Sequence, residues 1–185
     1  MTISRCRWAA TITDPGYLAY HDTEWSTKVR DDRSLFELLS LEGAMAGLSW
    51  LTILKKRQHY RNEFYNFDIA KVASMTVSDA EKILSNGLVV KHFGKIQSVL
   101  ANATACLDLI SEFGSLATYF DSVLECTDTT DLSITTAPVS EIATLISKNL
   151  KKRGFKFVGP TTIQSFLQAS GFFRAHDIQC FRYPK

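Results

Sequence analysis

Glu42 is the residue whose type and position most directly suggest chemistry. At helical spacing it belongs to an apolar stripe within residues 32–50, formed by Leu35, Leu38, Glu42 and Met45. The opposite side of that helix is expected to carry Glu37, Ser40 and Ala44. Burying an unpaired carboxylate costs several kcal/mol or keeps it protonated, so such a residue normally has a partner or a task. Glu42 is therefore either a structural carboxylate that binds nearby backbone or a group that acts on a substrate.

A basic hairpin at residues 147–171 is the second candidate site. Two helical segments flank a turn whose glycines, Gly154 and Gly159, would permit positive φ and let backbone amides approach an anion. Pro160 suits the first turn of the second helix, whose N-terminus adds partial positive charge. The expected DNA contacts are Lys151, Lys152, Arg153, Gly154, Lys156, Gly159 and Thr161. The pattern resembles a helix-hairpin-helix element that binds phosphates without reading bases; the alternative is an ordinary helical hairpin with a solvated basic face.

Cysteine and histidine residues at the two ends of the chain form the third candidate. His176 and Cys180 are four residues apart, and Cys6 and His21 could complete a tetrahedral Cys₂His₂ zinc site. With all four positions filled by protein, such a metal would be structural. Isolated cysteines and histidines are more often buried fillers or surface groups, so that alternative stays open.

The elements that must position these residues are predicted to be helices. Apolar residues recur at three- and four-residue intervals over residues 31–50, 52–66, 68–75, 78–85, 91–113, 115–123 and 140–152. Asp68, Ser78 and Ser140 are expected N-caps. Residues 125–138 are polar and poor in helix formers, so they are expected to be a long connection, with residues 132–136 as the one modest strand candidate. The predicted fold class is all-α.

Composition limits the classes of function. With 185 residues, 45% of them hydrophobic, the chain can form one good core or two small lobes that share a cleft. A net charge of +2 is too small to indicate nucleic-acid binding by itself. No apolar run is long enough to span a bilayer, and the first residues lack a signal-peptide core, so we expect a cytoplasmic protein. Its four cysteines are then better interpreted as free thiols or metal ligands than as disulfides.

Nine motifs taken together resemble, in order and spacing, the 3-methyladenine DNA glycosylase I family. They are Cys6-Arg-Trp8, Asp14-Pro-Gly-Tyr17, Tyr20-His-Asp-Thr-Glu-Trp25, Leu35-Phe-Glu37, Leu41-Glu-Gly43, Ala46-Gly-Leu-Ser-Trp50, Ile53-Leu-Lys-Lys-Arg57, the hairpin Leu150–Gly159 and His176-x-x-x-Cys180. The resemblance covers nearly the whole chain and is weakest over residues 111–140.

This resemblance implies one glycosylase domain over residues 1–185 with a helix-hairpin-helix fold of two helical lobes, its element at about 147–171. It implies that Cys6, His21, His176 and Cys180 bind one structural Zn²⁺ that joins the chain termini. It also implies a pocket in which Glu42 recognises 3-methyladenine beside Tyr20 and Trp50, with Trp8, Tyr17 and Trp25 nearby. The expected partner is double-stranded DNA that contains alkylated adenine, bound by a monomer.

The physical case for this chemistry rests on the charge of the lesion. A base inside a duplex must be flipped out before an enzyme reaches it, and a damaged base costs less to unstack. Cation–π attraction to each aromatic face stabilises a bound cationic alkylated adenine by roughly 0.5 to 2 kcal/mol. A neutral adenine gains less from the same faces. An ionised Glu42 can accept hydrogen bonds from the base and stabilise its charge. Since that base is a good leaving group, little general-base help is needed. The resemblance also implies that this family lacks the catalytic aspartate that the wider helix-hairpin-helix superfamily has beyond the hairpin, and Asp177 is too close to the hairpin to serve, so we assign it no catalytic role.

Three departures from the family pattern bear on efficiency. Ala44 stands where the family usually has glutamine, Phe93 where it often has arginine, and Ser26 where it has glycine. The expected function is a monofunctional glycosylase of base-excision repair, without a lysine to form a Schiff base. The alternative is a catalytically weak or inactive zinc-stabilised module that binds alkylated or distorted DNA.

Overall fold

The computed structural model describes residues 3–125 and 139–183, and in these residues the chain is helical without strands, which confirms the all-α prediction. The elements are α1 (Arg7–Ala10), α2 (Pro15–Thr23), α3 (Asp32–Met45), α4 (Trp50–Glu63), the 3₁₀ turn η1 (Tyr65–Phe67), α5 (Ile69–Ala73), α6 (Val77–Asn86), α7 (Phe93–Phe113), α8 (Leu116–Glu125), α9 (Glu141–Lys152) and α10 (Pro160–Ala169). The strand candidate at 132–136 and nearly all of the expected connection lie outside the described residues. No helix in these residues is long and apolar enough to cross a membrane.

Helix α3 is the central helix of the fold. It packs against α4, α7, α8 and α10, and every residue from Leu35 to Ala44 is buried. The side of α3 opposite the Glu42 stripe, with Glu37, Ser40 and Ala44, is therefore buried as well. The cause is that neighbouring helices surround α3, so an amphipathic pattern does not tell which side faces solvent. Glu37 tolerates burial because two arginines of α4 bind its carboxylate.

Local sequence signals explain where the helices begin, with two corrections. The predicted helix over 31–50 ends earlier, at Met45, because Gly47 adopts a φ of 76°; α4 begins at Trp50, where Ser49 caps it by accepting a hydrogen bond from the Thr52 amide. The predicted N-caps Asp68 and Ser140 are confirmed. The predicted N-cap Ser78 is wrong. The N-cap is Thr76, two residues before Ser78, and it forms a capping box with Asp79. The short helices α1 and α2 were not predicted.

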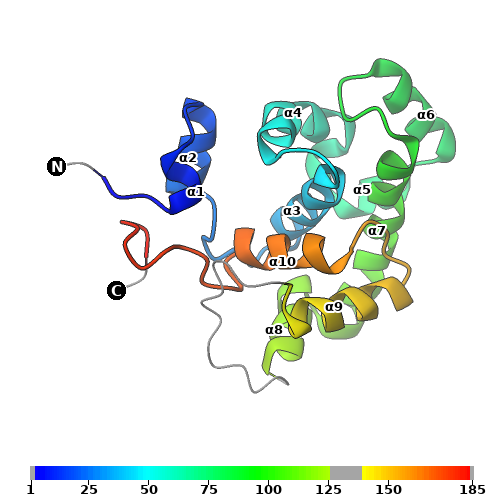
Figure 1. Ribbon diagram of the computed structural model, residues 1–185. Helices are drawn as coiled ribbons and strands as arrows, with labels where there is room; N and C mark the ends of the chain where they lie inside the picture. The colour runs from blue at the N-terminus through cyan, green and yellow to red at the C-terminus, as the bar shows by residue number, and fades with distance from the viewer. Residues whose placement is uncertain (1–2, 126–138, 184–185) are drawn as a thin grey trace.

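The chain ends meet on one side of the molecule, where α1 and α2 stand beside the C-terminal segment (Figure 1). The Phe181 amide donates to the Ser4 carbonyl at 2.8 Å. Farther in, the amides of Ser26 and Val29 donate to the last carbonyls of α10. Gly171 is required at this crossing, because a Cβ there would lie 2.7 Å from the Thr27 carbonyl carbon. These contacts place α2 next to α10 and so form one wall of the site.

Candidate functional site

An aromatic cavity of about 180 Å³ lies between α1, α2, α3, α4 and α10. Its lining consists of Trp8, Tyr17, Tyr20, Trp25, Glu42, Met45, Trp50, Ser165 and Gln168. All six pocket residues named from the sequence are among them. The structure thus brings together side chains that are up to 42 positions apart in the sequence, from Trp8 to Trp50. Their functional roles stay predictions.

The aromatic rings form a continuous wall. Tyr20 lies 5.2 Å from Trp50 between ring centroids, and Tyr17 lies 5.3 Å from Trp8. Trp25 meets the edge of Trp8 at 5.0 Å, and Tyr17 joins the two pairs at 6.4 Å from Tyr20. Helix α2 begins at Pro15 with Asp14 as its N-cap, and the three-residue spacing of the tyrosines places both on one face. Such a wall offers π-faces to a planar cationic ring.

Glu42 is the one carboxylate in the lining of this cavity. The residue is 4% exposed, and its Oε2 atom has no hydrogen-bond partner. Burial raises the pKa of Glu42 to about 8, so the carboxyl is largely protonated at neutral pH. The indole nitrogens of Trp8 and Trp50 are likewise buried without a partner. Three unsatisfied polar atoms on residues of one cavity indicate a site built for a polar ligand, because native structures rarely leave such groups unpaired.

Three lining residues were missed by the sequence analysis: Met45, Ser165 and Gln168. Met45 was on the predicted stripe with Glu42 but had no role assigned. Ser165 and Gln168 are three residues apart on α10, so they share a face. Their signal was this spacing of polar residues in the second hairpin helix, but only the packing of α10 against α3 shows what that face meets.

The four predicted metal ligands converge at the joined chain ends. Cys6, His21, His176 and Cys180 are all buried, and their potential ligand atoms lie within 4.8 Å of one another. The Cys6 Sγ atom is 3.4 Å from His176 Nδ1, and the Cys180 Sγ atom is 3.7 Å from His21 Nε2. These four residues could hold a metal ion.

The outer contacts of the two imidazoles fit metal ligation. His21 uses Nδ1 to contact Asp22 at 2.8 Å, and His176 uses Nε2 to contact the Trp25 carbonyl at 3.1 Å. Each ring is thus oriented so that its other nitrogen faces the thiols, as metal-binding histidines generally are. Burial lowers the pKa of His176 to about 4, which keeps the ring in the neutral form that a metal requires. Asp177 accepts a hydrogen bond from the Arg7 amide beside this cluster and does not line the cavity.

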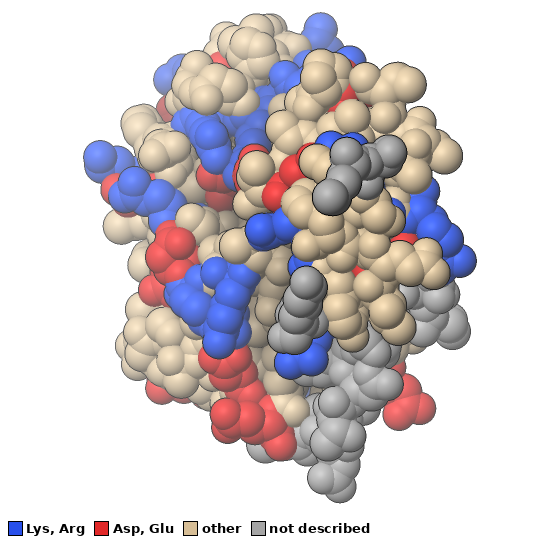
Figure 2. Space-filling model, turned by 90° about the vertical axis from the view of Figure 1, so that its left-hand side faces the viewer, with Lys and Arg blue, Asp and Glu red and all other residues tan. Residues whose placement is uncertain are grey.

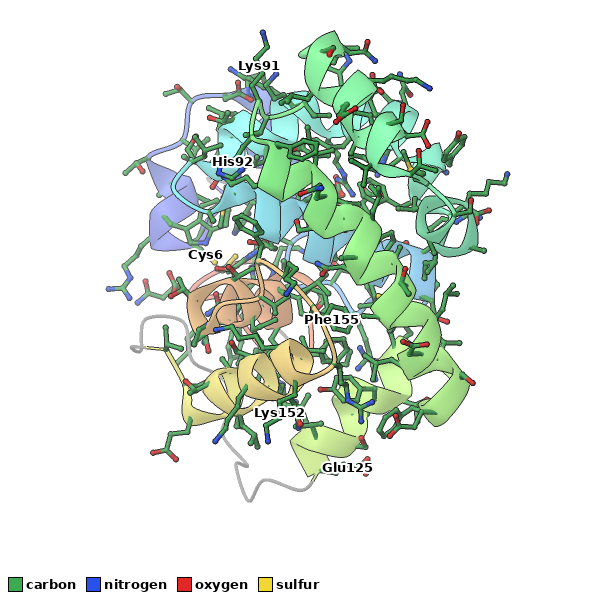
Figure 3. The ribbon with its side chains drawn as sticks, turned by 90° about the vertical axis from the view of Figure 1, so that its right-hand side faces the viewer. Cys6, Lys91, His92, Glu125, Lys152 and Phe155 are labelled. Atoms are coloured by element: carbon green, nitrogen blue, oxygen red, sulfur yellow. The ribbon has the colours of Figure 1, made fainter. Side chains whose placement is uncertain are left out.

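Charge is mixed on the face that carries the chain ends. Figure 2 shows lysines and arginines interspersed with acidic residues and large uncharged areas. The hairpin predicted from the sequence to contact phosphates carries several exposed residues. Lys151, Lys152 and Lys156 are exposed there, as are Gly154 and Thr161, and Figure 3 shows Lys152 on α9 and Phe155 in the turn that follows.

The hairpin turn is fixed against α3 and α7. The Asn102 side chain accepts from the Lys156 amide at 2.7 Å and donates to the Lys156 carbonyl at 3.0 Å. Gly43, which follows Glu42, meets the Phe157 backbone, since a Cβ at Gly43 would lie 3.2 Å from the Phe157 carbonyl oxygen. In the Leu-Glu-Gly motif, the glutamate therefore lines the cavity, and the glycine next to it allows the hairpin backbone to pack closely against α3.

The two hairpin glycines differ. Gly154 has a φ of 93°, as the turn prediction requires, but Gly159 has a φ of −62° and is the N-cap of α10. Of the two glycines that could permit positive φ, only Gly154 adopts it. No atom lies within 4 Å of a Cβ placed at Gly159, so the backbone is open to a ligand. Arg153 differs from the lysines, because its guanidinium forms a bidentate pair with Glu112 and lies over Phe113.

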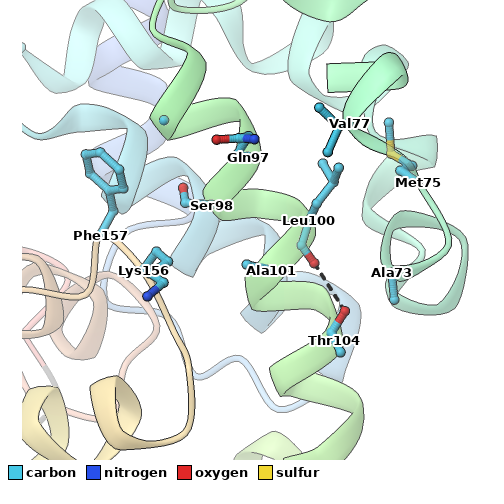
Figure 4. Close-up of a pocket in the computed structure, with 11 residues that line it drawn as sticks. Ala73, Met75, Val77, Gln97, Ser98, Leu100, Ala101, Thr104, Lys156 and Phe157 are labelled. Atoms are coloured by element: carbon cyan, nitrogen blue, oxygen red, sulfur yellow. Dashed lines mark hydrogen bonds between the residues drawn. The ribbon is translucent and has the colours of Figure 1, made fainter. Parts of the chain in front are cut away.

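A larger groove of about 570 Å³ runs along α7 beside the hairpin turn (Figure 4). Its labelled walls include Met75 and Val77 on one side and Lys156 and Phe157 on the other. The lining contains no carboxylate, thiol or imidazole. We therefore place the candidate site in the smaller aromatic cavity.

The three departures occupy distinct environments. Ala44 is buried, and its carbonyl accepts a hydrogen bond from the Lys95 ammonium. Phe93 begins α7 and packs against the core. Ser26 has a φ of 59°, which explains the glycine usual at this position. Its hydroxyl compensates by donating to the Phe173 carbonyl and accepting from the Ala175 amide.

A helical fold with an exposed basic hairpin and an aromatic cavity around one carboxylate is the arrangement expected of base-excising DNA repair proteins built on a helix-hairpin-helix element. Comparison with known proteins agrees. A family model described as methyladenine glycosylase matches residues 8–183, and this chain belongs to that family.

Curated relatives and solved structures match along nearly their whole length. DNA-3-methyladenine glycosylase 1 of Escherichia coli is 40% identical over 189 residues, which covers 98% of each chain. DNA-3-methyladenine glycosylase of Haemophilus influenzae is 37% identical and covers 96% of each. A crystal structure of 3-methyladenine DNA glycosylase I has a TM-score of 0.88 at 42% identity, covering 98% of this chain and 100% of that one. The Staphylococcus aureus enzyme, solved for its recognition of 3-methyladenine, gives 0.89 at 39% identity and 96% coverage of both.

Proposed function

We propose that this protein is a monofunctional DNA glycosylase that removes 3-methyladenine from alkylated double-stranded DNA in base-excision repair. The observation that carries the proposal is the unpaired Glu42 carboxyl in a cavity walled by aromatic rings. The full-length similarity to enzymes named for this lesion supports the choice of base.

The residues act by recognising charge. The flipped base enters the cavity, where Tyr20 and Trp50 flank it and their π-faces attract its positive charge. Glu42, once ionised, accepts hydrogen bonds from the base edge and balances that charge. The bond between the base and C1′ breaks, and its electron pair passes to the base, which leaves neutral. Water then adds its hydroxyl to C1′ and releases a proton. The described residues that line the cavity include no lysine, so no covalent Schiff-base route is assigned.

Binding of the duplex is assigned to the hairpin. The open backbone at Gly159 and the exposed lysines of α9 support contacts to phosphates, which orient the DNA without reading its sequence. Residues of a single chain are enough to line the cavity, so its formation requires no second copy of the protein. We infer that the protein acts in the cytoplasm, in line with its similarity to bacterial DNA-3-methyladenine glycosylases.

We also infer that Cys6, His21, His176 and Cys180 hold one Zn²⁺. Two thiolates and two imidazoles are a ligand set that zinc prefers, and four protein ligands leave no position for a substrate. The metal would stabilise the joined chain ends and take no part in base excision.

A base-release assay on methylated duplex DNA tests the function. We expect the parent protein to release 3-methyladenine and the Glu42→Gln variant to release it far more slowly per folded molecule, while both bind undamaged duplex equally. Glutamine keeps the shape of the side chain but cannot carry the charge. If the parent binds lesion DNA without releasing a base, the protein is a binding module for alkylated DNA; if Glu42→Gln releases base at the parental rate, the pocket assignment fails.

A further inference from the structure

Arg57 connects three of the helices that form the base cavity. Its Nε atom donates to Glu37 of α3 at 2.5 Å, and its NH1 atom donates to Glu24 at 2.5 Å. Glu24 is the C-cap of α2, and its backbone amide donates to the Tyr20 carbonyl. One guanidinium on α4 therefore binds both the helix that carries Glu42 and the end of the helix that carries Tyr20.

Arg57 and Trp50 also share a face of α4. They are seven residues apart, which is close to two full helical turns, so both side chains extend from the same side of the helix. Trp50 contributes to the cavity wall, and Arg57 reaches the two carboxylates farther along. The register of α4 therefore determines where both groups lie relative to α2 and α3.

Tyr20 lies between two cavities. Besides the base cavity, its side chain lines a second cavity of about 240 Å³, whose walls include Glu24, Glu37 and Arg57. The ring is 3% exposed and belongs to the hydrophobic core, and on this side it borders a cavity lined in part by charged side chains. In Figure 1, α2 also stands apart from the α3–α4 pair, so side chains must bridge the interval. The ion pairs of Arg57 supply such a bridge next to Tyr20.

The environment of these pairs favours a fixed geometry. The Arg57 side chain is 15% exposed and that of Glu37 is 9% exposed, so solvent screens this pair less than an ordinary surface pair. The planar guanidinium fork can bind two carboxylates at once in a defined geometry, unlike an ammonium group. A second link between α4 and α2, from Lys55 to Asp14, is more exposed and therefore weaker.

We propose that Arg57 is a positioning residue, which sets the separation between Tyr20 and the Glu42–Trp50 side of the base cavity through its simultaneous contacts with Glu24 and Glu37. The inference rests on the proposed function, because it assigns that cavity to the base. Arg57 itself does not line the cavity and makes no direct contact with the base.

Arg61 provides a matched control. It is one turn farther along α4 and also binds Glu37, at 2.9 Å, but within the described residues its recorded ion pair does not extend to α2. Arg57→Met and Arg61→Met each remove one arginine from Glu37 and leave the other. The two variants therefore share the loss at α3, and only Arg57→Met loses the link to α2.

The experiment measures the affinity for free 3-methyladenine by quenching of tryptophan fluorescence, in protein confirmed as folded. We expect Arg57→Met to weaken binding about five- to tenfold and Arg61→Met less than about twofold. Glu24→Gln should weaken binding as Arg57→Met does, and the double variant should lose no more than either single one, because both remove the same link. Affinity for undamaged duplex should stay at the parental value in all of them.

Two results would overturn the inference: equal losses in Arg57→Met and Arg61→Met, or additive losses when Arg57→Met and Glu24→Gln are combined. If Arg57→Met does not fold, Glu24→Gln decides alone, since Glu24 is about half exposed and its loss leaves Glu37 paired with two arginines. A parent protein that binds no 3-methyladenine would instead refute the proposed function, and this inference with it.

Discussion

At the scale of single residues, Glu42 combines burial with an unsatisfied oxygen. The parent fold therefore holds a carboxyl that is mostly neutral at pH 7, while a cationic base calls for an ionised one. Binding a cation beside it would lower its pKa and release a proton. The residue thus links recognition of the lesion to pH.

The first prediction follows from the raised pKa of Glu42. At pH values below the Glu42 pKa of about 8, the ionised fraction of the carboxyl falls about tenfold for each unit by which the pH is lowered. We expect kcat/KM for 3-methyladenine release to rise with pH up to about 8 and then level off, because this parameter reports the free enzyme. Glu42→Gln should abolish that rise. A parental profile that instead falls toward pH 8 would mean that the protonated carboxyl binds the base.

The same pKa predicts an effect on stability. The unfolded state loses the proton of Glu42 near pH 4.5 and the folded state near pH 8, so the folded state binds more protons between these values. The free energy of unfolding contributed by this group is therefore greatest below pH 4.5 and falls as the pH rises toward 8. Glu42→Gln should remove this decline, as measured by urea denaturation at pH 5 and pH 8. A variant with the same decline as the parent would contradict the assignment.

At the scale of elements, some hairpin residues are expected to affect stability and others to affect DNA binding. Gly154 needs positive φ, whereas Gly159 has ordinary dihedral angles and open space around it. The charges of the turn also differ, since Arg153 is paired with Glu112 and the lysines of α9 are exposed. These differences define matched pairs of variants.

We expect Gly159→Val to weaken binding of lesion and undamaged duplex to a similar degree, because it blocks a backbone contact to phosphate. Its effect on stability should stay within about 1 kcal/mol, the usual range for an N-cap change. Gly154→Val should instead lower the melting temperature. Lys152→Ala should reduce the slope of log affinity against log salt by about one unit, and Arg153→Ala by less. A salt titration in which all four variants match the parent would refute the DNA-binding role of the hairpin.

Ser26 shows how one departure from the family pattern is accommodated. Ser26→Ala keeps the strained φ and loses both hydrogen bonds to the segment before His176, so we expect a loss of about 1 to 3 kcal/mol in the free energy of unfolding. Ser26→Gly loses the same bonds but relieves the strain, so its loss should be smaller. Thermal and chemical denaturation of the two variants measure this order, and the reverse order would show that the strain is negligible.

At the scale of the whole molecule, the cysteine–histidine cluster connects the first and last segments of the chain to the cavity wall. Trp8 and Trp25 pack against both the cluster and the aromatic cavity. The metal site and the pocket therefore share two side chains, and loss of one should be detected at the other.

The zinc assignment predicts about one equivalent of Zn²⁺ by elemental analysis of the purified protein. A chelator should lower the melting temperature and change tryptophan fluorescence, since the metal supports the wall that holds Trp8 and Trp25. Cys180→Ser should reproduce both effects, and Cys106→Ser, which changes a buried cysteine away from the cluster, should retain the metal. Metal well below one equivalent with an unchanged melting temperature would exclude the assignment.

Several features were determined by local sequence. The helical class, the caps at Asp68 and Ser140 and the hairpin with Pro160 at the start of α10 depend on periodicity and capping, which act over a few residues. Six of the nine residues that line the cavity, and all four of the cluster, were also named from the sequence, through motifs whose order and spacing resemble a known family.

Tertiary structure decided what depends on neighbours distant in sequence. Burial on both sides of α3, the bridge from Arg57 to two helices and the contribution of α10 to the cavity all require knowing which surfaces meet. The raised pKa of Glu42 has the same origin, because desolvation comes from the surrounding helices and not from adjacent residues. The local pattern places a carboxylate on a helix face, and the packing around that face determines its protonation.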